Sequence, residues 1–190
     1  MSGMFNKCYK LQTINISNFD TSSSETMYKM FSECFSLISL DLRNFDTSKV
    51  TNMQSMFYKC VSLKEIDVSS FNTNKVTNMN FMFSGYTDYD MQLERIIGLE
   101  NFDTSQVTTM QAMFQRCSNL TSIDLRNFDT NSVTDMSYMF NSTTNLKPIY
   151  IVEKWKTATT TTNMFNESKT ASVEDMCEPN STEEWCVVAG

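Results

Sequence analysis

One arrangement of apolar and polar positions recurs along nearly the whole chain, and its marker is the dipeptide Met-Phe. Successive copies of the marker are 26, 26, 26, 31, 26 and 25 residues apart. A fixed period of this length is typical of solenoids, in which each unit buries its apolar face against its neighbours. The chain of 190 residues is therefore expected to form one elongated domain. The aromatic residues of the markers are Phe5, Phe31, Phe57, Phe83, Phe114, Phe140 and Phe165.

Each unit contains two apolar patterns that are joined by polar turns. The first, over residues 50–60, has apolar side chains at offsets 0, 3, 6, 7 and 10, which fits one face of a short helix. Thr51 would be the N-cap of this helix. The second pattern alternates apolar and polar side chains at Ile66-Asp67-Val68, which predicts a short strand with one buried face. Asp and Asn side chains close the following turn by bonding the backbone two residues on.

The repeated Met and Phe side chains are expected to form the core. Phe45, Phe71, Phe102 and Phe128 occupy one position in four units, and their rings are predicted to stack along the axis of the solenoid. Single rows of this kind resemble a cofactor groove, but at solenoid spacing they are more typical of buried packing.

The consensus V-T-N-M-x-x-M-F-x-x-C-x-x-L-x-x-L-D-L-x-N-F-D-T-S resembles the BspA-like leucine-rich repeat surface proteins of bacteria, over about residues 1–170. The resemblance implies an α/β solenoid, a right-handed superhelix like that of leucine-rich repeats. In it a parallel sheet lines the concave side, and short helices or turns line the convex side. It also implies adhesion at the cell surface and binding of host or partner proteins. The family shares no catalytic residues that could be carried over.

The repeat divides the chain into a solenoid of about six to seven units of 25–26 residues over residues 1–170, and a C-terminal cap or tail over residues 171–190. An insertion at residues 85–92 lengthens one unit. The first residues already lie inside a unit, with Met1 in the place of Met27 and Met53. The sequence is therefore expected to be a fragment of a longer protein, or another chain covers its N-terminal end.

Charge and composition narrow the range of partners. The formal net charge is −7, and the 15 Lys and Arg are scattered, so the chain lacks the basic stripe that binds a nucleic-acid backbone. No run approaches the roughly 18 apolar residues of a membrane helix, and no signal peptide precedes the first repeat. The expected location is extracellular or at the cell surface, which the resemblance implies.

The sequence carries no constellation typical of an enzyme. It contains no His, which removes the commonest general base and the commonest metal ligand. No glycine-rich phosphate loop is present. We therefore expect a non-enzymatic protein without a cofactor or a metal site.

Four of the six cysteines share one position, three residues after Met-Phe. Parallel side chains on neighbouring units fit disulfide geometry poorly, so Cys8, Cys34, Cys60 and Cys117 are predicted to be free, buried thiols. Cys177 and Cys186 lie outside this row. They are candidates for a disulfide in an oxidising compartment, although their spacing leaves the pairing open.

A row of polar residues lies on the strand face that points away from the core. Asp41, Asp67 and Asp124 occupy equivalent positions, and Gly98 and Tyr150 extend the row. Carboxylates on adjacent strands repel each other, and we expect arginines two residues on to offset this by pairing across strands. The face is interpreted either as a solvated surface or as a concave ligand surface, which would consist of Asp41, Arg43, Asp67, Asp124, Arg126 and Tyr150.

The insertion is a second candidate surface, because insertions in solenoids form loops on one face, often the binding face. Two tyrosines beside two aspartates suit a protein contact. The alternative is a tolerated surface loop without a partner. The candidate contact residues are Tyr86, Asp88, Tyr89 and Asp90.

These observations favour a surface interaction or adhesion module that presents a concave polar face to a protein or glycan partner. The alternative is a structural component of a larger assembly, for example a viral particle, that docks or oligomerises through its uncapped N-terminal unit. The least favoured hypothesis is an enzyme whose active site contains only carboxylates.

Overall fold

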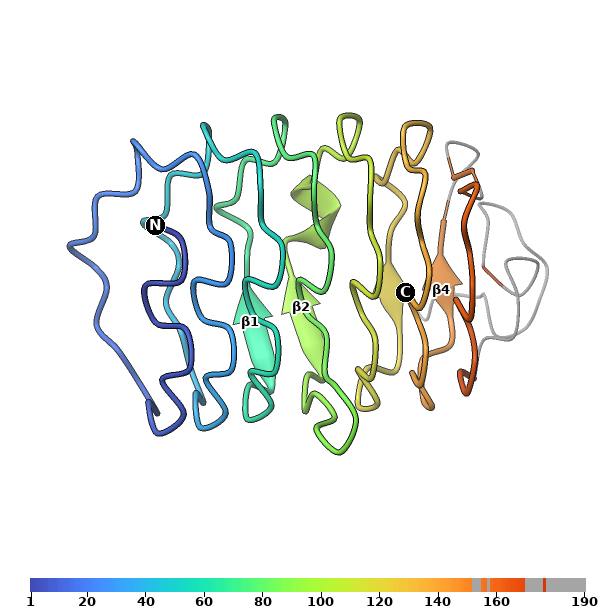
Figure 1. Ribbon diagram of the computed structural model, residues 1–190, viewed down its shortest axis with the longest axis horizontal. Coiled ribbons are helices and arrows are strands. Elements are labelled where there is room, and N and C mark those ends of the chain that lie inside the picture. The colour runs from blue at the N-terminus through green and yellow to red at the C-terminus, as the bar shows by residue number, and fades with distance from the viewer. Residues whose placement is uncertain (152–154, 157, 170–175, 177–190) are drawn as a thin grey trace, which may run out of the picture.

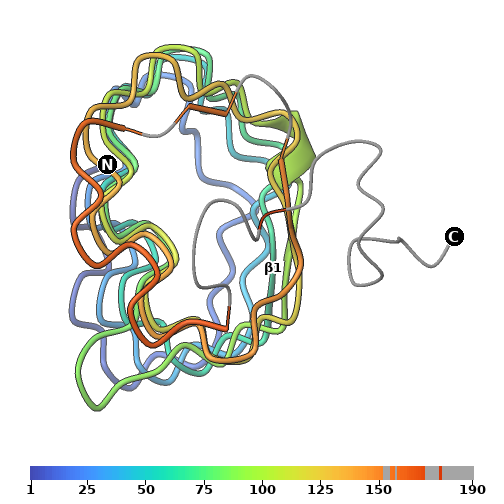
Figure 2. The same ribbon diagram turned by 90° about the vertical axis from the view of Figure 1, so that its right-hand side faces the viewer.

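The computed structural model describes residues 1–151, 155–156, 158–169 and 176. Within them the chain winds in successive turns, one for each repeat, which lie side by side along the long axis of the molecule (Figure 1). Viewed along that axis, the turns follow one another in nearly the same outline (Figure 2). Residues one period apart therefore occupy equivalent places, and this is why each unit can bond to the next.

Regular secondary structure is sparse in the described part of the chain. Parallel pairing joins the strands into two separate two-stranded sheets, β1 with β2 and β3 with β4. No described segment forms a helix that is long and apolar enough to cross a membrane. The elements are β1 (Glu65–Asp67), β2 (Arg95–Ile97), the 3-10 helix η1 (Leu99–Asn101), β3 (Ile123–Asp124) and β4 (Ile149–Tyr150).

Three of the four strands, β1, β3 and β4, lie where the alternating apolar and polar pattern predicts a strand. The equivalent segment of an earlier unit, residues 40–42, is not a strand. The handedness and curvature that the leucine-rich-repeat resemblance implies stay predictions.

The short helix expected over residues 50–60 is wrong, and the described residues contain no α-helix. Instead this segment makes consecutive turns, in which the N–H groups of Met56 and Cys60 donate to carbonyls three residues earlier, at 3.2 and 3.1 Å. The N–H groups of Ser55, Phe57 and Lys59 donate to carbonyls of the next unit at 2.8–3.0 Å. Ser55 and Lys59 have φ values of 57° and 58°, and such left-handed residues end a right-handed helix.

The threonine expected to cap that helix instead connects two units. The backbone N–H and the hydroxyl of Thr51 both donate to the Glu25 carbonyl in the preceding unit, at 2.9 and 3.2 Å. A second threonine row is buried between units. The hydroxyl of Thr47 donates to the Asn72 carbonyl at 2.9 Å and accepts from the Asn72 N–H at 2.8 Å. In both threonine rows the hydroxyl groups therefore make hydrogen bonds between stacked units and do not cap a helix.

The core consists of the repeated apolar positions, as predicted. The marker rings stack on one another from Phe5 to Phe165, with centroids 5.4–5.9 Å apart and interplanar angles of 3–14°. The second row is also buried, and Phe102 stacks on Phe128 at 6.2 Å. The continuous ring stack therefore involves the marker position, and only one described pair of the second row shares this geometry.

The prediction of unpaired thiols is confirmed for Cys8, Cys34, Cys60 and Cys117. The Cys60 thiol donates to the Phe31 carbonyl of the preceding unit at 3.0 Å. Burial raises the pKa of Cys34 to about 11, so the thiol stays protonated and packs as a small apolar group. Cys177 and Cys186, like most of the expected C-terminal cap, lie outside the described residues.

The longest unit gains its extra residues at two places. Ile66 pairs with Ile96, 30 positions later, so four residues are added to the usual 26 before β2. One more is added after β2, where Gly98 adopts φ 93° and its Cα approaches the preceding unit. A Cβ there would lie 2.3 Å from the Ser69 backbone nitrogen. Asp67 therefore pairs with Ile97, and the expectation that Gly98 continues the Asp row is wrong because Gly98 is a bulge residue.

Candidate ligand-binding surfaces

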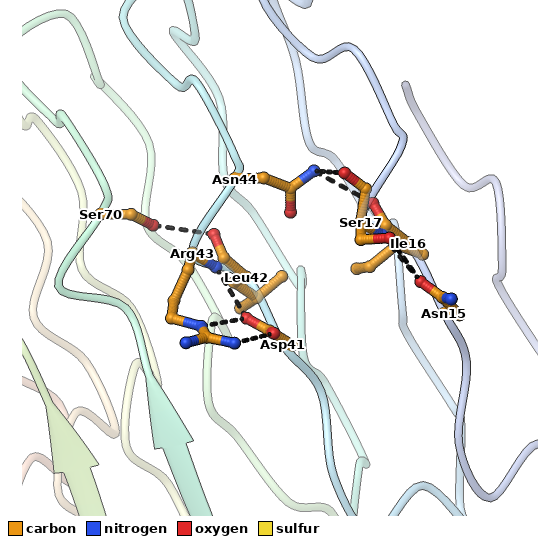
Figure 3. A network of polar contacts seen from close by, with 8 residues as sticks. All are labelled: Asn15, Ile16, Ser17, Asp41, Leu42, Arg43, Asn44 and Ser70. Carbon is orange, nitrogen blue, oxygen red and sulfur yellow. Dashed lines mark hydrogen bonds and ion pairs between the residues drawn. The ribbon is translucent and has the colours of Figure 1, made fainter.

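The first surface residues are Asp41 and Arg43, which form an exposed ion pair within one unit (Figure 3). Arg43 Nε donates to Asp41 Oδ1 at 2.9 Å and Nη2 donates to Oδ2 at 2.6 Å. The Arg43 backbone N–H also donates to Oδ1 at 3.1 Å. We expected the arginine to pair with an aspartate of a neighbouring strand, and this expectation is wrong. Asp41 and Arg43 are two positions apart in extended chain, so their side chains lie on the same face, and the backbone hydrogen bond already holds them together.

The same ion pair recurs at Asp124 and Arg126. Arg126 Nε and Nη2 donate to the two carboxylate oxygens at 3.0 and 2.6 Å. Asp124 on β3 is in register with Tyr150 on β4, and the Arg126 guanidinium carbon lies 6.0 Å from the Tyr150 ring centroid. The structure thus brings these three predicted residues together.

The polar row also holds the backbone in place. The Asp67 carboxylate accepts from the Ser69 N–H at 2.9 Å, in the same way that Asp41 accepts from the next-but-one N–H. The Asn44 carboxamide donates to the carbonyls of Ile16 and Ser17 in the preceding unit (Figure 3). A structural role in turn closure therefore accounts for the repetition of Asp at this position.

Hydrogen bonds keep these carboxyl groups ionised. The side chain of Arg43 lowers the pKa of Asp41 to about 2, and that of Arg126 lowers the pKa of Asp124. Hydrogen bonds from Ser69 lower the pKa of Asp67. The Arg43 side chain is 81% exposed, and exposed ion pairs contribute little to stability. The charged groups are thus held in place yet open to a ligand.

The six predicted residues line two hollows, three residues in each, and their joint role as one ligand surface stays a prediction. Asp41, Arg43 and Asp67 line a hollow of about 340 Å³. The other hollow has a volume of about 370 Å³ and lies between β2 and β3, where no strand pairing joins the two sheets. This β2–β3 hollow follows the bulge at Gly98. It is lined by Glu94, Arg95, Ile96, Leu99, Glu100, Leu120, Ser122, Ile123, Asp124, Arg126 and Tyr150.

The insertion forms a loop that projects from one edge of the stack (green in Figures 1 and 2). Tyr86 and Tyr89 exchange backbone hydrogen bonds of 2.9 and 2.7 Å, which closes the tip. Asp90 forms an ion pair with Arg116 of the next unit at 2.9 Å, and the Met91 N–H donates to the Arg116 carbonyl at 2.9 Å. The loop is therefore anchored at its tip and at its return.

The loop also forms an aromatic cluster with residues of the three preceding units. The Tyr89 ring stacks on Phe35, with centroids 5.1 Å apart and an interplanar angle of 15°, and Phe35 contacts Tyr9 at 5.1 Å. The Lys59 ammonium lies 4.5 Å from the Tyr86 ring centroid and 5.7 Å from that of Tyr89, within the range of cation–π attraction. Lys59 and Phe35 were not among the predicted site residues.

A third hollow, the loop hollow, has a volume of about 510 Å³ and lies beside the insertion. Three of the four predicted loop residues line it, whereas Tyr86 belongs to the aromatic cluster. One sequence signal could have revealed the cluster: Tyr9 and Phe35 are aromatic at the same repeat position, directly after the cysteine, in adjacent units. The lining residues are Val61, Ser62, Asp88, Tyr89, Asp90, Gln92 and Arg116.

No three Cys, Asp or Glu side chains gather into a group that could hold a metal ion within the part of the chain that the structure describes. Two overlapping matches to one protein-family model cover residues 1–96 and 66–177, and that family is described as "Mycoplasma protein of unknown function, DUF285". Neither the curated proteins nor the solved structures gave a match.

Proposed function

The chain belongs to this family of Mycoplasma proteins, and we propose that it is a non-enzymatic interaction module that acts in adhesion at the cell surface. The resemblance to BspA-like leucine-rich repeat proteins supports this proposal. The partner is a protein or a glycan, bound on the polar strand face.

One observation carries the proposal. The stacked units hold Arg126, Asp124 and Tyr150 in fixed positions around the open β2–β3 hollow. Arg and Tyr are the residue types that most often dominate binding energy in protein interfaces. Because a backbone turn and a paired strand fix these side chains, a partner would meet a surface that needs little ordering on binding.

Binding of the fluorescently labelled chain to cultured host cells, measured by flow cytometry, tests the proposal. We expect the double variant Arg126→Ala, Tyr150→Ala to bind at least about tenfold more weakly, as for interface positions that dominate affinity. Lys75→Ala removes the same positive charge from an exposed residue outside the three hollows and should bind like the wild type. Saturable binding that is equal in all three proteins would place the interface elsewhere, and absence of saturable binding would contradict the proposed function.

The alternative, a structural component that docks through its N-terminal unit, stays a prediction. Residues of that unit are partly exposed, with Met4 49% exposed. Size-exclusion chromatography with light scattering distinguishes the two functions. An oligomer that dissociates on Met4→Ser substitution would favour assembly, whereas a monomer at all concentrations would count against self-assembly.

A further inference from the structure

We propose that the loop hollow binds a neutral sugar ring of a glycan. This inference rests on the proposed function, since it assigns one partner class to one site on the same module. The site is separate from the β2–β3 hollow, and no residue lines both. It lies beside the insertion at residues 85–92, which makes the third full unit longer than the others.

Contacts within the protein hold the loop without any ligand. The paired backbone bonds between Tyr86 and Tyr89 close its tip, and the ion pair between Asp90 and Arg116 holds its return. Gly85 allows the chain to fold back on itself, because a Cβ there would lie 2.4 Å from the Tyr89 carbonyl oxygen. A preorganised site of this kind avoids the ordering cost that a mobile loop would add to binding.

Tyr89 brings an aromatic ring to the wall of the hollow, and the part of the ring that Phe35 and Lys59 leave exposed is available to a ligand. Tyr89 is 43% exposed, and its stacking on Phe35 fixes the orientation of its ring. A pyranose has one face made of C–H groups, and burial of that apolar face against an aromatic ring removes both from water. An aromatic side chain also offers this contact area at low conformational cost.

The remaining lining side chains match the hydroxyl groups of a sugar. The Asn119 carboxamide donates to Gln92 Oε1 at 3.1 Å, so the Gln92 amide N–H groups are the donors that this lining side chain can offer. Ser62 Oγ donates to the Phe35 carbonyl at 2.6 Å, so its oxygen lone pairs can accept. The Asp88 carboxylate is a further acceptor. Donors and acceptors are thus interspersed, as a polyol requires.

Charge and size favour a neutral small ring over other ligands. Asp90 and Arg116 neutralise each other. The hollow then has the negative charge of Asp88 on one side and the positive Lys59 ammonium 5.7 Å from the Tyr89 ring centroid on the other, so no excess of one charge calls for an ionic ligand. A volume of about 510 Å³ falls in the range of roughly 300–1,000 Å³ that small-ligand sites occupy. A protein partner would instead cover about 800 Å² of surface, far beyond the hollow.

Saturation-transfer NMR on the full chain tests the inference. The neutral probes are methyl glucoside, methyl galactoside and N-acetylglucosamine, and N-acetylneuraminic acid is the anionic comparison. We expect transfer to at least one neutral probe and none to the anionic sugar. The Tyr89→Ala variant should bind at least about tenfold more weakly, whereas Tyr89→Phe, which keeps the ring, should bind within a few-fold of the wild type.

Tyr9→Ala is the matched control. Tyr9 is similarly exposed, at 45%, and also contacts Phe35, but it does not line the hollow. Its removal should leave sugar binding unchanged, and circular dichroism should show that every variant is folded. An equal loss in Tyr9→Ala and Tyr89→Ala, or no transfer to any neutral probe, would overturn the inference.

The cell-binding assay separates this inference from the proposed function. If no sugar binds and the Tyr89→Ala protein still binds cells, the sugar site is wrong and the interaction module stands. If a set of peptides binds the wild type but not Tyr89→Ala, and no sugar binds, the hollow belongs to a protein partner and the inference is also overturned.

Discussion

The buried threonine between units provides a direct test of how the stack is held together. Thr47 is 1% exposed, and its hydroxyl both donates to and accepts from the Asn72 backbone of the next unit, at 2.9 and 2.8 Å. Thr47→Val keeps the shape of the side chain but removes both bonds. Because each bond crosses between units, the substitution should weaken stacking and leave the turn itself intact.

The expected loss follows from the number of bonds. A buried hydrogen bond contributes about 0.5–1.5 kcal/mol net, so removal of two should lower the free energy of unfolding by about 1–3 kcal/mol. The matched control is Thr77→Val, whose exposed hydroxyl lies 3.2 Å from the Thr51 carbonyl. That carbonyl already accepts the Thr77 N–H at 2.9 Å, and an exposed substitution of this kind should cost about 0.5 kcal/mol or less.

Equilibrium urea unfolding, followed by circular dichroism, measures both variants. The midpoint should fall for Thr47→Val at constant m-value, since the exposed surface on unfolding is unchanged. Thr104 makes the same pair of bonds to Asp129, and its replacement by Val should give a similar loss. Equal stabilities of Thr47→Val and Thr77→Val would refute the claim that the buried row joins the units.

Three further substitutions test the core, the bulge and the strand face. Phe71→Ala should lower the free energy of unfolding by about 3–5 kcal/mol, because the ring is 3% exposed; an unchanged thermal midpoint would contradict its place in the core. Gly98→Ala should lower the thermal midpoint more than Gly3→Ala, since a Cβ at Gly98 would lie 2.3 Å from a backbone nitrogen while one at Gly3 has its nearest neighbour at 3.8 Å. The pKa of Asp41, lowered to about 2 by Arg43, implies a contribution to stability that is complete above about pH 3.9 and is lost as pH falls toward 2. In Arg43→Ala the carboxyl resonance of Asp41 should titrate nearer its ordinary pKa, and an unchanged titration midpoint would argue against the ion pair.

The failure of the helix prediction has a specific cause. The apolar spacing of Val50, Met53, Met56 and Phe57 fits a helical face, but it equally fits a chain of tight turns with the same residues pointing inward. A helix and this chain of turns differ in their hydrogen bonds: in a helix the N–H groups donate within the same segment, whereas here alternate N–H groups donate to carbonyls of the next unit. The N–H of Ser55 finds its acceptor, the Asn80 carbonyl, in the neighbouring unit, so stacking of units stabilises the turn structure.

In the candidate surfaces, too, some features follow from the local sequence and others depend on contacts between units. Asp41 and Arg43 were predicted on one face by the period of two, and the structure places them together, although as partners within a unit. The β2–β3 hollow lies between two sheets that no strand pairing joins, and Leu99, directly after Gly98, is one of its lining residues. Lys59 and Phe35 join the insertion loop only because the loop folds back over the preceding units.

The sequence by itself determined the period, the buried rows and the unpaired state of the four repeated thiols, because a fixed spacing forces equivalent residues into equivalent environments. It also determined the turns closed by Asp and Asn, which need only residues two positions away. Only the tertiary structure decided the backbone conformation of the Met-Phe segment, the role of the threonines and the shape of the hollows. In each of these the hydrogen-bonding partner or the contacting ring belongs to a different unit, about 26 residues or more away, and no local pattern specifies how two such segments meet.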